Sequence, residues 1–247
     1  MAGPLSDPPE NIVLLHGFGG TGRTWDGVLE RLPAESPALA LDLPGHGAEA
    51  RSGSPITFDG CVEHVLAASP RSFVLCGYSL GGRVALHVAL AAPERVRRLV
   101  LVSTGAGIED PLERERRRSA DHALAEDLEG GPFAEFLERW NAQPLFAEDP
   151  PAVVALARQD QLRNRAGGLA AALRGIGGGE MEPLWGRLGE IDRPATVLVG
   201  QRDERYLAIG RRLADGLPRG ELVVAPGGHR LALENPGAVA AAIRGPG

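Results

Sequence analysis

Short runs of apolar residues alternate along this chain with segments typical of helices. The runs are continuous, which is the pattern of strands that are buried on both faces of a parallel sheet. They occupy residues 12–15, 38–43, 73–76, 99–103, 196–200 and 221–225. Alternating strands and helices predict an α/β fold with a mostly parallel sheet, right-handed crossovers and helices on both faces.

This alternation stops between about Ile108 and Trp185. The stretch has no convincing strand pattern, but it has several helical ones, which include residues 112–128, 133–141 and 152–162. Open α/β folds bind ligands at the carboxyl ends of their strands, so we expect the insertion to form a cap over that edge. The sequence predicts three parts, which are core residues 1–107, a helical cap at 108–185 and core residues 186–247.

One turn between a predicted strand and a predicted helix carries a chemical motif. Gly77-Tyr78-Ser79-Leu80-Gly81 joins the apolar run 73–76 to the helical segment 83–90. In this context a G-x-S-x-G turn holds its serine in a strained conformation, with Oγ exposed at the head of a helix. Ser79 is therefore the predicted catalytic serine. The alternative is an incidental serine in a glycine-rich turn.

Two later strand ends supply the partners that such a serine needs. A catalytic serine needs a base within hydrogen-bond reach, and the base needs a carboxylate to orient it. Asp203 follows the run 196–200 and His229 follows 221–225, in the order that this fold expects. Glu204 is the alternative acid, and taken alone Asp203 would be a helix N-cap.

Backbone amides near the serine could stabilise negative charge on a reacting oxygen. Two such N–H groups are needed, and the candidates are those of Phe18, in the glycine-rich loop after the first strand, and Leu80. The remaining histidines near predicted loops and helices are expected to be structural; they are His16, His46 and His87.

Composition restricts the class of protein further. The chain has 247 residues, 43% of them hydrophobic, and a net charge of -6, so nothing global indicates nucleic-acid binding. No run approaches the roughly 18 apolar residues that span a bilayer, and the N-terminus lacks the pattern of a signal peptide. We expect a cytoplasmic protein with no membrane partner. Cys61 and Cys76 lack metal-ligand spacing and are expected to be buried and reduced.

Several motifs together resemble those of the α/β-hydrolase superfamily over nearly the whole chain. They are His16-Gly17-Phe18-Gly19-Gly20, Leu41-Asp42-Leu43-Pro44-Gly45-His46-Gly47, the serine turn and Gly228-His229. Within it, the chain resembles the menaquinone-pathway lyases called 2-succinyl-6-hydroxy-2,4-cyclohexadiene-1-carboxylate synthases. The segments that carry this likeness are residues 77–83, 116–121, Trp140 with 143–146, 162–164, and the loops at 202–203 and 229.

The second resemblance implies an activity. Enzymes of that family use the triad to take a proton from the ring of 2-succinyl-5-enolpyruvyl-6-hydroxy-3-cyclohexene-1-carboxylate and expel pyruvate, with no cofactor and no metal. Such a substrate is small and carries three carboxylates. The implied substrate-binding residues are Tyr78, Arg83, Arg118, Trp140 and Arg163. For the assembly we expect a monomer or a weak homo-oligomer.

Arg83 has independent physical support. It lies four residues after Ser79, so on a helix that begins at the turn it returns to the serine's face. A cation in the first helical turn opposes the macrodipole, and an anionic substrate would explain it. Arg118 has a plainer alternative, because its segment also has the pattern of a solvated helix face with a Glu113–Arg117 pair.

One position departs from the family pattern. Ala232 stands where a second histidine usually follows the catalytic one by three residues. A diverged relative with another substrate therefore stays open, as does a carboxylesterase or C–C bond hydrolase that uses Ser79 as a nucleophile. A non-catalytic binding protein of this fold is a third alternative, but such proteins commonly lose a triad member, and none is missing here.

Overall fold

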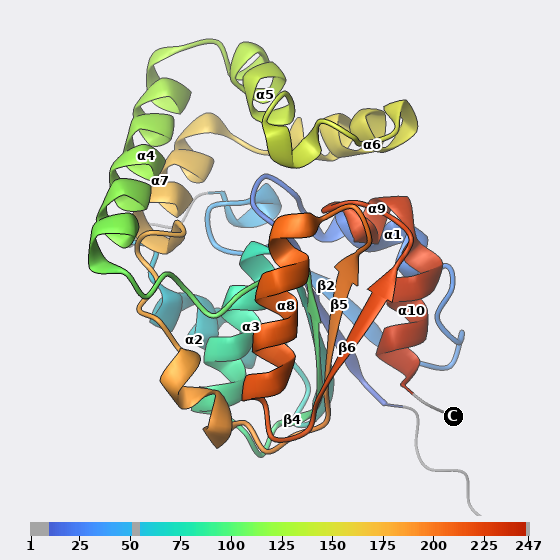
Figure 1. The fold of residues 1–247 in the computed structure, drawn as a ribbon. Coiled ribbons are helices and arrows are strands. Elements are labelled where there is room, and N and C mark those ends of the chain that lie inside the picture. Colours follow the sequence, from blue (N-terminus) through green and yellow to red (C-terminus); the bar gives the residue numbers. More distant parts are fainter. Residues whose placement is uncertain (1–9, 51–54, 246–247) are drawn as a thin grey trace, which may run out of the picture.

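The computed structural model describes residues 10–50 and 55–245, and its centre is one parallel sheet (Figure 1). The strand order is β2-β1-β3-β4-β5-β6. The strands are β1 (Ile12–Leu15), β2 (Ala38–Leu41), β3 (Phe73–Tyr78), β4 (Val96–Val102), β5 (Ala195–Gly200) and β6 (Gly220–Ala225). The predicted α/β fold is confirmed, although β2 ends two residues before the predicted Leu43 and β3 continues two residues beyond Cys76.

Helices cover both faces of this sheet (Figure 1). One face carries α2 (Phe58–Ala68), α3 (Leu80–Ala91) and α8 (Glu204–Gly216). The other carries α1 (Asp26–Leu29), α9 (Leu231–Glu234) and α10 (Pro236–Arg244). Short 3-10 turns complete the core at η1 (Gly22–Trp25), η2 (Gly47–Glu49) and η4 (Trp185–Glu190).

The sheet divides the apolar core into two layers. Successive side chains of a strand point to opposite faces, so Val13 packs with the α2 and α3 side while Leu14 packs with the α1 and α10 side. Both layers are closed by helices, which explains why the strand sequences are continuously apolar. The free cysteines Cys61 and Cys76 are buried in opposite layers.

Four helices between β4 and β5 form a cap over the carboxyl ends of the strands (Figure 1). They are α4 (Pro111–Gly130), α5 (Phe133–Asn141), α6 (Pro151–Gln161) and α7 (Ala166–Ile176), with η3 (Pro144–Phe146) between α5 and α6. The cap has its own apolar cluster, which includes Leu128, Phe136 and Leu173. The pattern analysis did not single out α7, because its three glycines lower its helix propensity.

The two ends of the cap segment lie side by side. The Leu184 N–H donates to the Ala106 carbonyl at 2.7 Å, and the Trp185 indole N–H donates to the Gly107 carbonyl at 2.8 Å. These bonds lie at the predicted limits of the cap, near residues 107 and 185. The division of the chain into three parts remains a prediction.

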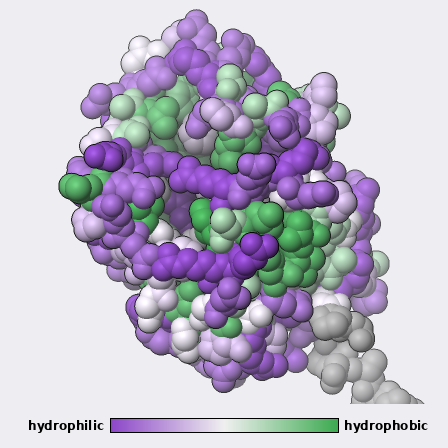
Figure 2. All heavy atoms as spheres, viewed as in Figure 1, coloured by the Kyte–Doolittle hydropathy of each residue, from purple (hydrophilic) through white to green (hydrophobic). Residues whose placement is uncertain are grey.

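The sheet ends at β6, and this edge is open. Val223 and Val224 are exposed there, and Figure 2 shows apolar side chains gathered on this side of the molecule. Elsewhere on the same face, hydrophilic side chains predominate. Within residues 10–50 and 55–245, no helix combines the length and apolarity that crossing a membrane requires.

Candidate active site

The turn after β3 has the strained geometry that its sequence predicts. Ser79 has φ 50° and ψ -109°, which L residues rarely adopt. The flanking glycines are required by close packing, since a Cβ on Gly77 would lie 2.3 Å from the Gly81 carbonyl oxygen. A Cβ on Gly81 would lie 2.1 Å from the Leu15 carbonyl oxygen. Since β3 extends through Tyr78, Ser79 alone joins the strand to α3.

Ser79, His229 and Asp203 form one hydrogen-bonded chain. The distance from His229 Nδ1 to Asp203 Oδ2 is 2.7 Å, and that from His229 Nε2 to Ser79 Oγ is 3.3 Å. A carboxylate only accepts hydrogen bonds, so Nδ1 carries the proton and Nε2 is free to accept the serine hydroxyl proton. Both partners of the serine are buried. The imidazole is therefore oriented as a base toward Ser79.

The acid in this chain is Asp203, not its neighbour Glu204. Asp203 also caps α8, because one of its carboxylate oxygens accepts the Tyr206 N–H at 3.4 Å. The N-cap and the histidine partner, which were alternatives in the sequence, are thus the same side chain. Glu204 is exposed at the start of α8.

Aromatic side chains surround the His229 ring. Its centroid lies 4.6 Å from that of Tyr206, 5.5 Å from Tyr78 and 5.9 Å from Phe146. Tyr78 comes from the core strand and Phe146 from the cap, so the histidine lies where the two parts meet. Burial raises the pKa of the Tyr78 phenol, so that Tyr78 stays neutral at physiological pH.

Two backbone amides lie beside the serine. Leu80 is the first residue of α3, where an N–H has no intrahelical acceptor, and Phe18 lies in the loop after β1. This loop packs against the turn, because a Cβ on Gly17 would lie 3.4 Å from Ser79 Cβ. Among the hydrogen bonds of residues 10–50 and 55–245, none is donated by either N–H. Neither amide is thus engaged by a protein acceptor in the described residues.

Three other histidines bond to the backbone, as expected for structural residues. His16 Nε2 accepts the Leu43 N–H at 3.0 Å, and the His87 ring contacts the Arg83 carbonyl at 2.8 Å. His46 packs 4.9 Å from His16 between ring centroids and 5.6 Å from Phe18. Burial, followed by the neighbouring His16, lowers the pKa of His46 to about 3, so the ring is neutral at physiological pH.

A cavity of about 840 Å³ opens above Ser79 between the core and the cap. In the space-filling view, a hollow bordered by hydrophilic side chains separates the two (Figure 2). The expected site residues that line the cavity are Phe18, Tyr78, Ser79, Arg83, Trp140, Asp203 and His229. Its dimensions suit a small molecule.

Arg83 presents an unsatisfied cation to this cavity. Its Nη1 atom is shielded from solvent and has no hydrogen-bond partner within the described residues. Burial lowers the pKa of Arg83, and the charge of nearby Arg117 lowers it further, while Tyr206 opposes both effects. A guanidinium nevertheless stays charged in a protein. An anionic group in the cavity would satisfy Nη1.

Arg117 also lines this cavity, as do Arg202 and Arg205, whereas Arg118, which the resemblance implied, is not among the lining residues. Arg117 lines the cavity, and its Nε donates to the buried Asp121 at 2.8 Å. Arg118 instead pairs with Glu115 at 2.8 Å and Glu180 at 3.2 Å. Adjacent helical residues are about 100° apart around the axis, so a shift of one residue moves a side chain out of the cavity.

The same contact replaces the expected Glu113–Arg117 pair by an Arg117–Asp121 pair. The sequence spacing allowed either pair, because Glu113 lies four residues before Arg117 and Asp121 four residues after it. Tyr206 and Phe146 were also not predicted as site residues, although both line the cavity.

Arg163 is not at this cavity either. Its side chain is half-exposed, lies 3.9 Å from Asp160 and lines separate surface grooves with Arg23 and Asp26. Ala232 is buried in α9 and borders one of these grooves, not the cavity above Ser79. The missing second histidine therefore changes a position outside the cavity.

Comparison with known proteins places this architecture in a family. Residues 12–242 match the family model described as "Alpha/beta hydrolase family". The chain belongs to the alpha/beta hydrolase family. Within this family, the chain is 35% identical over 241 residues to 2-succinyl-6-hydroxy-2,4-cyclohexadiene-1-carboxylate synthase from Klebsiella pneumoniae, with 94% of this chain and 91% of the relative covered.

Solved structures of the family agree with both predicted resemblances. MenH from S. aureus superposes with a TM-score of 0.90 at 30% identity, covering 99% of this chain and 95% of its own. A thermophilic esterase from Thermogutta terrifontis gives a TM-score of 0.78 at 28% identity, covering 95% of this chain and 88% of the esterase. The resemblance to the superfamily and to the synthases within it is thus confirmed.

Proposed function

We propose that this enzyme is a lyase of menaquinone biosynthesis. It eliminates pyruvate from 2-succinyl-5-enolpyruvyl-6-hydroxy-3-cyclohexene-1-carboxylate and forms 2-succinyl-6-hydroxy-2,4-cyclohexadiene-1-carboxylate. The observation that carries the proposal is that Arg83 and Arg117 line the same cavity as the Ser79–His229–Asp203 chain. The name of the Klebsiella relative supports the choice of reaction.

The lining holds carboxylates as well as arginines, and Arg83 and Arg117 are the two groups in it that support an anionic substrate. Arg83 and Arg117 repel each other in this cavity; Arg117 is paired with Asp121, whereas Arg83 has no ion pair within residues 10–50 and 55–245. Arg202, which also lines the cavity, is already paired with Glu148 and Glu234. A substrate carboxylate would offset the repulsion and bond to Arg83 Nη1, in a charge-assisted contact stronger than a neutral one. Arg83 and Arg117 are the residues that we assign to substrate carboxylates. Tyr78 and Trp140 supply apolar walls for the ring.

The hydrogen-bonded chain can perform the proton transfer. His229 Nε2 takes the hydroxyl proton of Ser79, and the serine oxygen takes the ring proton next to the succinyl carbonyl. The electron pair of the broken C–H bond passes through an enolate, whose oxygen the Phe18 and Leu80 amides stabilise. It then forms a C2=C3 double bond, the existing C3=C4 pair shifts to C4=C5, and the C–O bond from C5 to the enolpyruvyl group breaks, which leaves the conjugated diene. The proton on His229 goes to the leaving group, which departs as pyruvate.

This elimination is redox-neutral, so it balances without an oxidant or a cofactor. We place the reaction in the cytoplasm, with the protein as a monomer or a weak homo-oligomer and a small anionic molecule as its substrate.

A carboxylesterase is the second candidate. The same serine, histidine and aspartate could attack an ester carbonyl, and the likeness to the Thermogutta esterase favours this alternative. The two candidates differ at the serine. An esterase forms an acyl group on Ser79, whereas the lyase uses Ser79 only to transfer a proton.

Product analysis separates the two candidates. The enolpyruvyl substrate is added to the enzyme, and pyruvate is followed with a lactate dehydrogenase coupling while the conjugated diene is followed by absorbance. We expect both products in equal amounts, with short neutral p-nitrophenyl esters turned over poorly and without a burst. A burst of nitrophenol with a trappable acyl group on Ser79, and no pyruvate, would favour the esterase.

A further inference from the structure

The loop that carries Phe18 is rich in glycine and needs support from outside. It runs from Gly17 to Thr24, and glycine at positions 17, 19, 20 and 22 gives its backbone unusual freedom. Two backbone bonds lie within it, from the Gly20 N–H to the Gly17 carbonyl and from the Thr24 N–H to the Thr21 carbonyl. Neither bond holds the loop against the rest of the protein.

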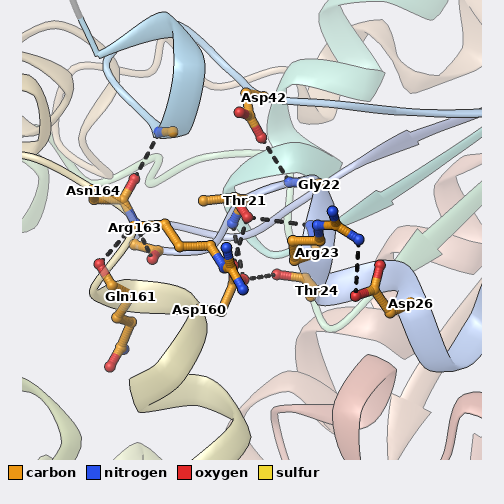
Figure 3. A network of polar contacts seen from close by, with 12 residues as sticks. Thr21, Gly22, Arg23, Thr24, Asp26, Asp42, Asp160, Gln161, Arg163 and Asn164 are labelled. Carbon is orange, nitrogen blue, oxygen red and sulfur yellow. Dashed lines mark hydrogen bonds and ion pairs between the residues drawn. The ribbon is translucent and has the colours of Figure 1, made fainter.

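Part of that support comes from the core, where Asp42 accepts the Gly22 N–H at 2.7 Å, and part from the end of α6 in the cap (Figure 3). Asp160 accepts three hydrogen bonds from the loop, from the Thr21 N–H at 3.0 Å, the Thr21 hydroxyl at 2.5 Å and the Thr24 hydroxyl at 2.8 Å. All three residues are buried. Hydrogen bonds to an ionised, buried group are among the stronger ones in a protein.

Asn164 adds a second connection four residues later. Its Nδ2 donates to the Gly19 carbonyl at 2.7 Å, and its Oδ1 accepts the Gly47 N–H at 2.9 Å. The amide therefore joins the loop to the turn that follows β2. Gly19 and Thr21 are one and three residues after Phe18, so the cap fixes the backbone immediately next to the proposed oxyanion donor.

The position of Asp160 argues against a role within α6 itself. The residue lies at the C-terminal end of the helix, where the macrodipole disfavours a negative charge. Within residues 10–50 and 55–245, its one ion pair is with the half-exposed Arg163, at 3.9 Å. The hydrogen bonds from the loop are thus the main interactions that stabilise this buried carboxylate.

We infer that Asp160 and Asn164 are positioning residues that hold the Phe18 amide in place for the reaction. This inference rests on the proposed function, because it assumes that charge develops on an oxygen beside Phe18. It assigns a role to the segment 160–164 that differs from the substrate binding predicted for Arg163. The cap would then not only enclose the substrate but also complete the oxyanion site of the core.

The test uses Asp160→Asn together with a matched pair at Thr24. Asp160→Asn replaces one of the two acceptor oxygens by an NH2 group, which cannot accept a hydrogen bond from the loop. Thr24→Val keeps the shape of the side chain but removes one bond to Asp160, while Thr24→Ser keeps the hydroxyl. A misplacement of about 1 Å can lower a rate by about 100-fold, so we expect Asp160→Asn to lower kcat by roughly 10- to 100-fold with KM changed less than about threefold.

Thr24→Val should lower kcat by a few-fold, whereas Thr24→Ser should keep kcat near the wild-type value. A control is Glu129→Gln, which breaks an ion pair between α4 and α7 inside the cap, at 2.8 Å from Arg174, and touches no part of the loop. It should leave kcat unchanged. If the bonds serve only to keep the cap folded, Asp160→Asn and Glu129→Gln should act alike on kcat and on Tm.

Hydrogen exchange of the amides of residues 17–24 gives a readout that needs no substrate. We expect faster exchange in Asp160→Asn and Thr24→Val than in Thr24→Ser, with exchange in β3 and β4 unchanged. A folded Asp160→Asn variant with wild-type kcat, or with a low kcat and wild-type exchange in the loop, would overturn the inference. If Asp160→Asn does not fold, the Thr24 pair decides by the same criteria.

These outcomes stay separate from those of the proposed function. If the wild-type enzyme releases no pyruvate, the proposed reaction is wrong, and the variants are compared on p-nitrophenyl acetate, whose hydrolysis also places charge on an oxygen. If pyruvate is released but the variants behave like the wild type, the reaction stands and the positioning role does not.

Discussion

The core and the cap contribute to the same cavity, but they place their side chains in different ways. The core contributes Ser79, Asp203 and His229, each in a loop at the carboxyl end of a strand. The cap contributes Arg117, Trp140 and Phe146 from helices or the segment between them. The core residues expected from the sequence lie together at this cavity. Of the two cap arginines expected there, Arg118 is one position from Arg117, which lines the cavity, and Arg163 lies elsewhere.

The comparison shows how each architecture converts sequence into position. Parallel strands end at one edge of the sheet, so the loops after β3, β5 and β6 meet there, whatever the details of packing. A helix distributes its side chains around an axis, and neighbours such as Arg117 and Arg118 point in directions about 100° apart. A prediction that is wrong by one residue therefore still places a side chain near the cavity when the residue follows a strand, but not when the residue lies in a helix.

Removing core residues should have the largest effect. Ser79→Ala and His229→Ala should each lower kcat by at least about 1000-fold, because each breaks the same proton-transfer chain. The double variant should be little worse than Ser79→Ala, and Asp203→Ala should be milder. Steady-state kinetics of pyruvate release measures all four. Losses that add up in the double variant would mean that these residues do not act as a unit.

A pair of neighbouring cap variants tests the next effect. Loss of one partner of a desolvated charge pair costs about 2 to 5 kcal/mol, so Arg117→Ala should lower kcat/KM by roughly 30-fold or more. Arg83→Ala should act similarly. Arg118→Ala is the matched control and should stay within about twofold, since surface pairs such as Arg118–Glu115 contribute little. A larger loss in Arg118→Ala than in Arg117→Ala would show that Arg118, not Arg117, meets the substrate.

Acid should lower the free energy of unfolding through the buried histidines of the core. The pKa of His46 is about 3 in the folded protein, but about 6.5 when the chain is unfolded. Between these values the unfolded state binds more protons, so the free energy of unfolding falls as the pH falls. The loss from this residue is about 2 kcal/mol between pH 7 and pH 5. His16 and His87, whose pKa values burial also lowers, act in the same direction.

His46→Asn provides the comparison for this effect. Asparagine can keep a hydrogen bond to the Pro44 carbonyl but does not titrate in this range, so its packing cost is the same at every pH. Urea unfolding at pH 7 and pH 5 should therefore show a smaller loss in the variant, by about 2 kcal/mol. Equal losses in the wild type and His46→Asn would contradict the buried, neutral ring.

The smallest effect is expected at Arg163. The side chain is half-exposed and outside the cavity, so Arg163→Ala should change kcat/KM by less than about twofold. Measuring it beside Asn164→Asp, which breaks the bond to the Gly19 carbonyl, compares two adjacent residues at the end of α6. A large loss for Arg163→Ala alone would return the substrate role to the residue that the sequence first indicated.

The sequence by itself determined the parallel sheet, the strained serine and the order of its partners. Continuous apolar runs specify strands that are buried on both faces, and the glycines around Ser79 specify a turn in which side chains would collide with the neighbouring backbone. These signals are local, or they depend only on where strands end. They could therefore be interpreted without knowing how distant segments pack.

Only the tertiary structure decided what the cap does. That Arg117 faces the cavity depends on the contact between α4 and the segment after α7, where buried Asp121 bonds both Arg117 and the Gly179 N–H. The bonds of Asp160 and Asn164 join residues more than 100 positions apart in the chain. Packing between helices selects one side chain among several of the same type, and a sequence pattern does not contain that choice.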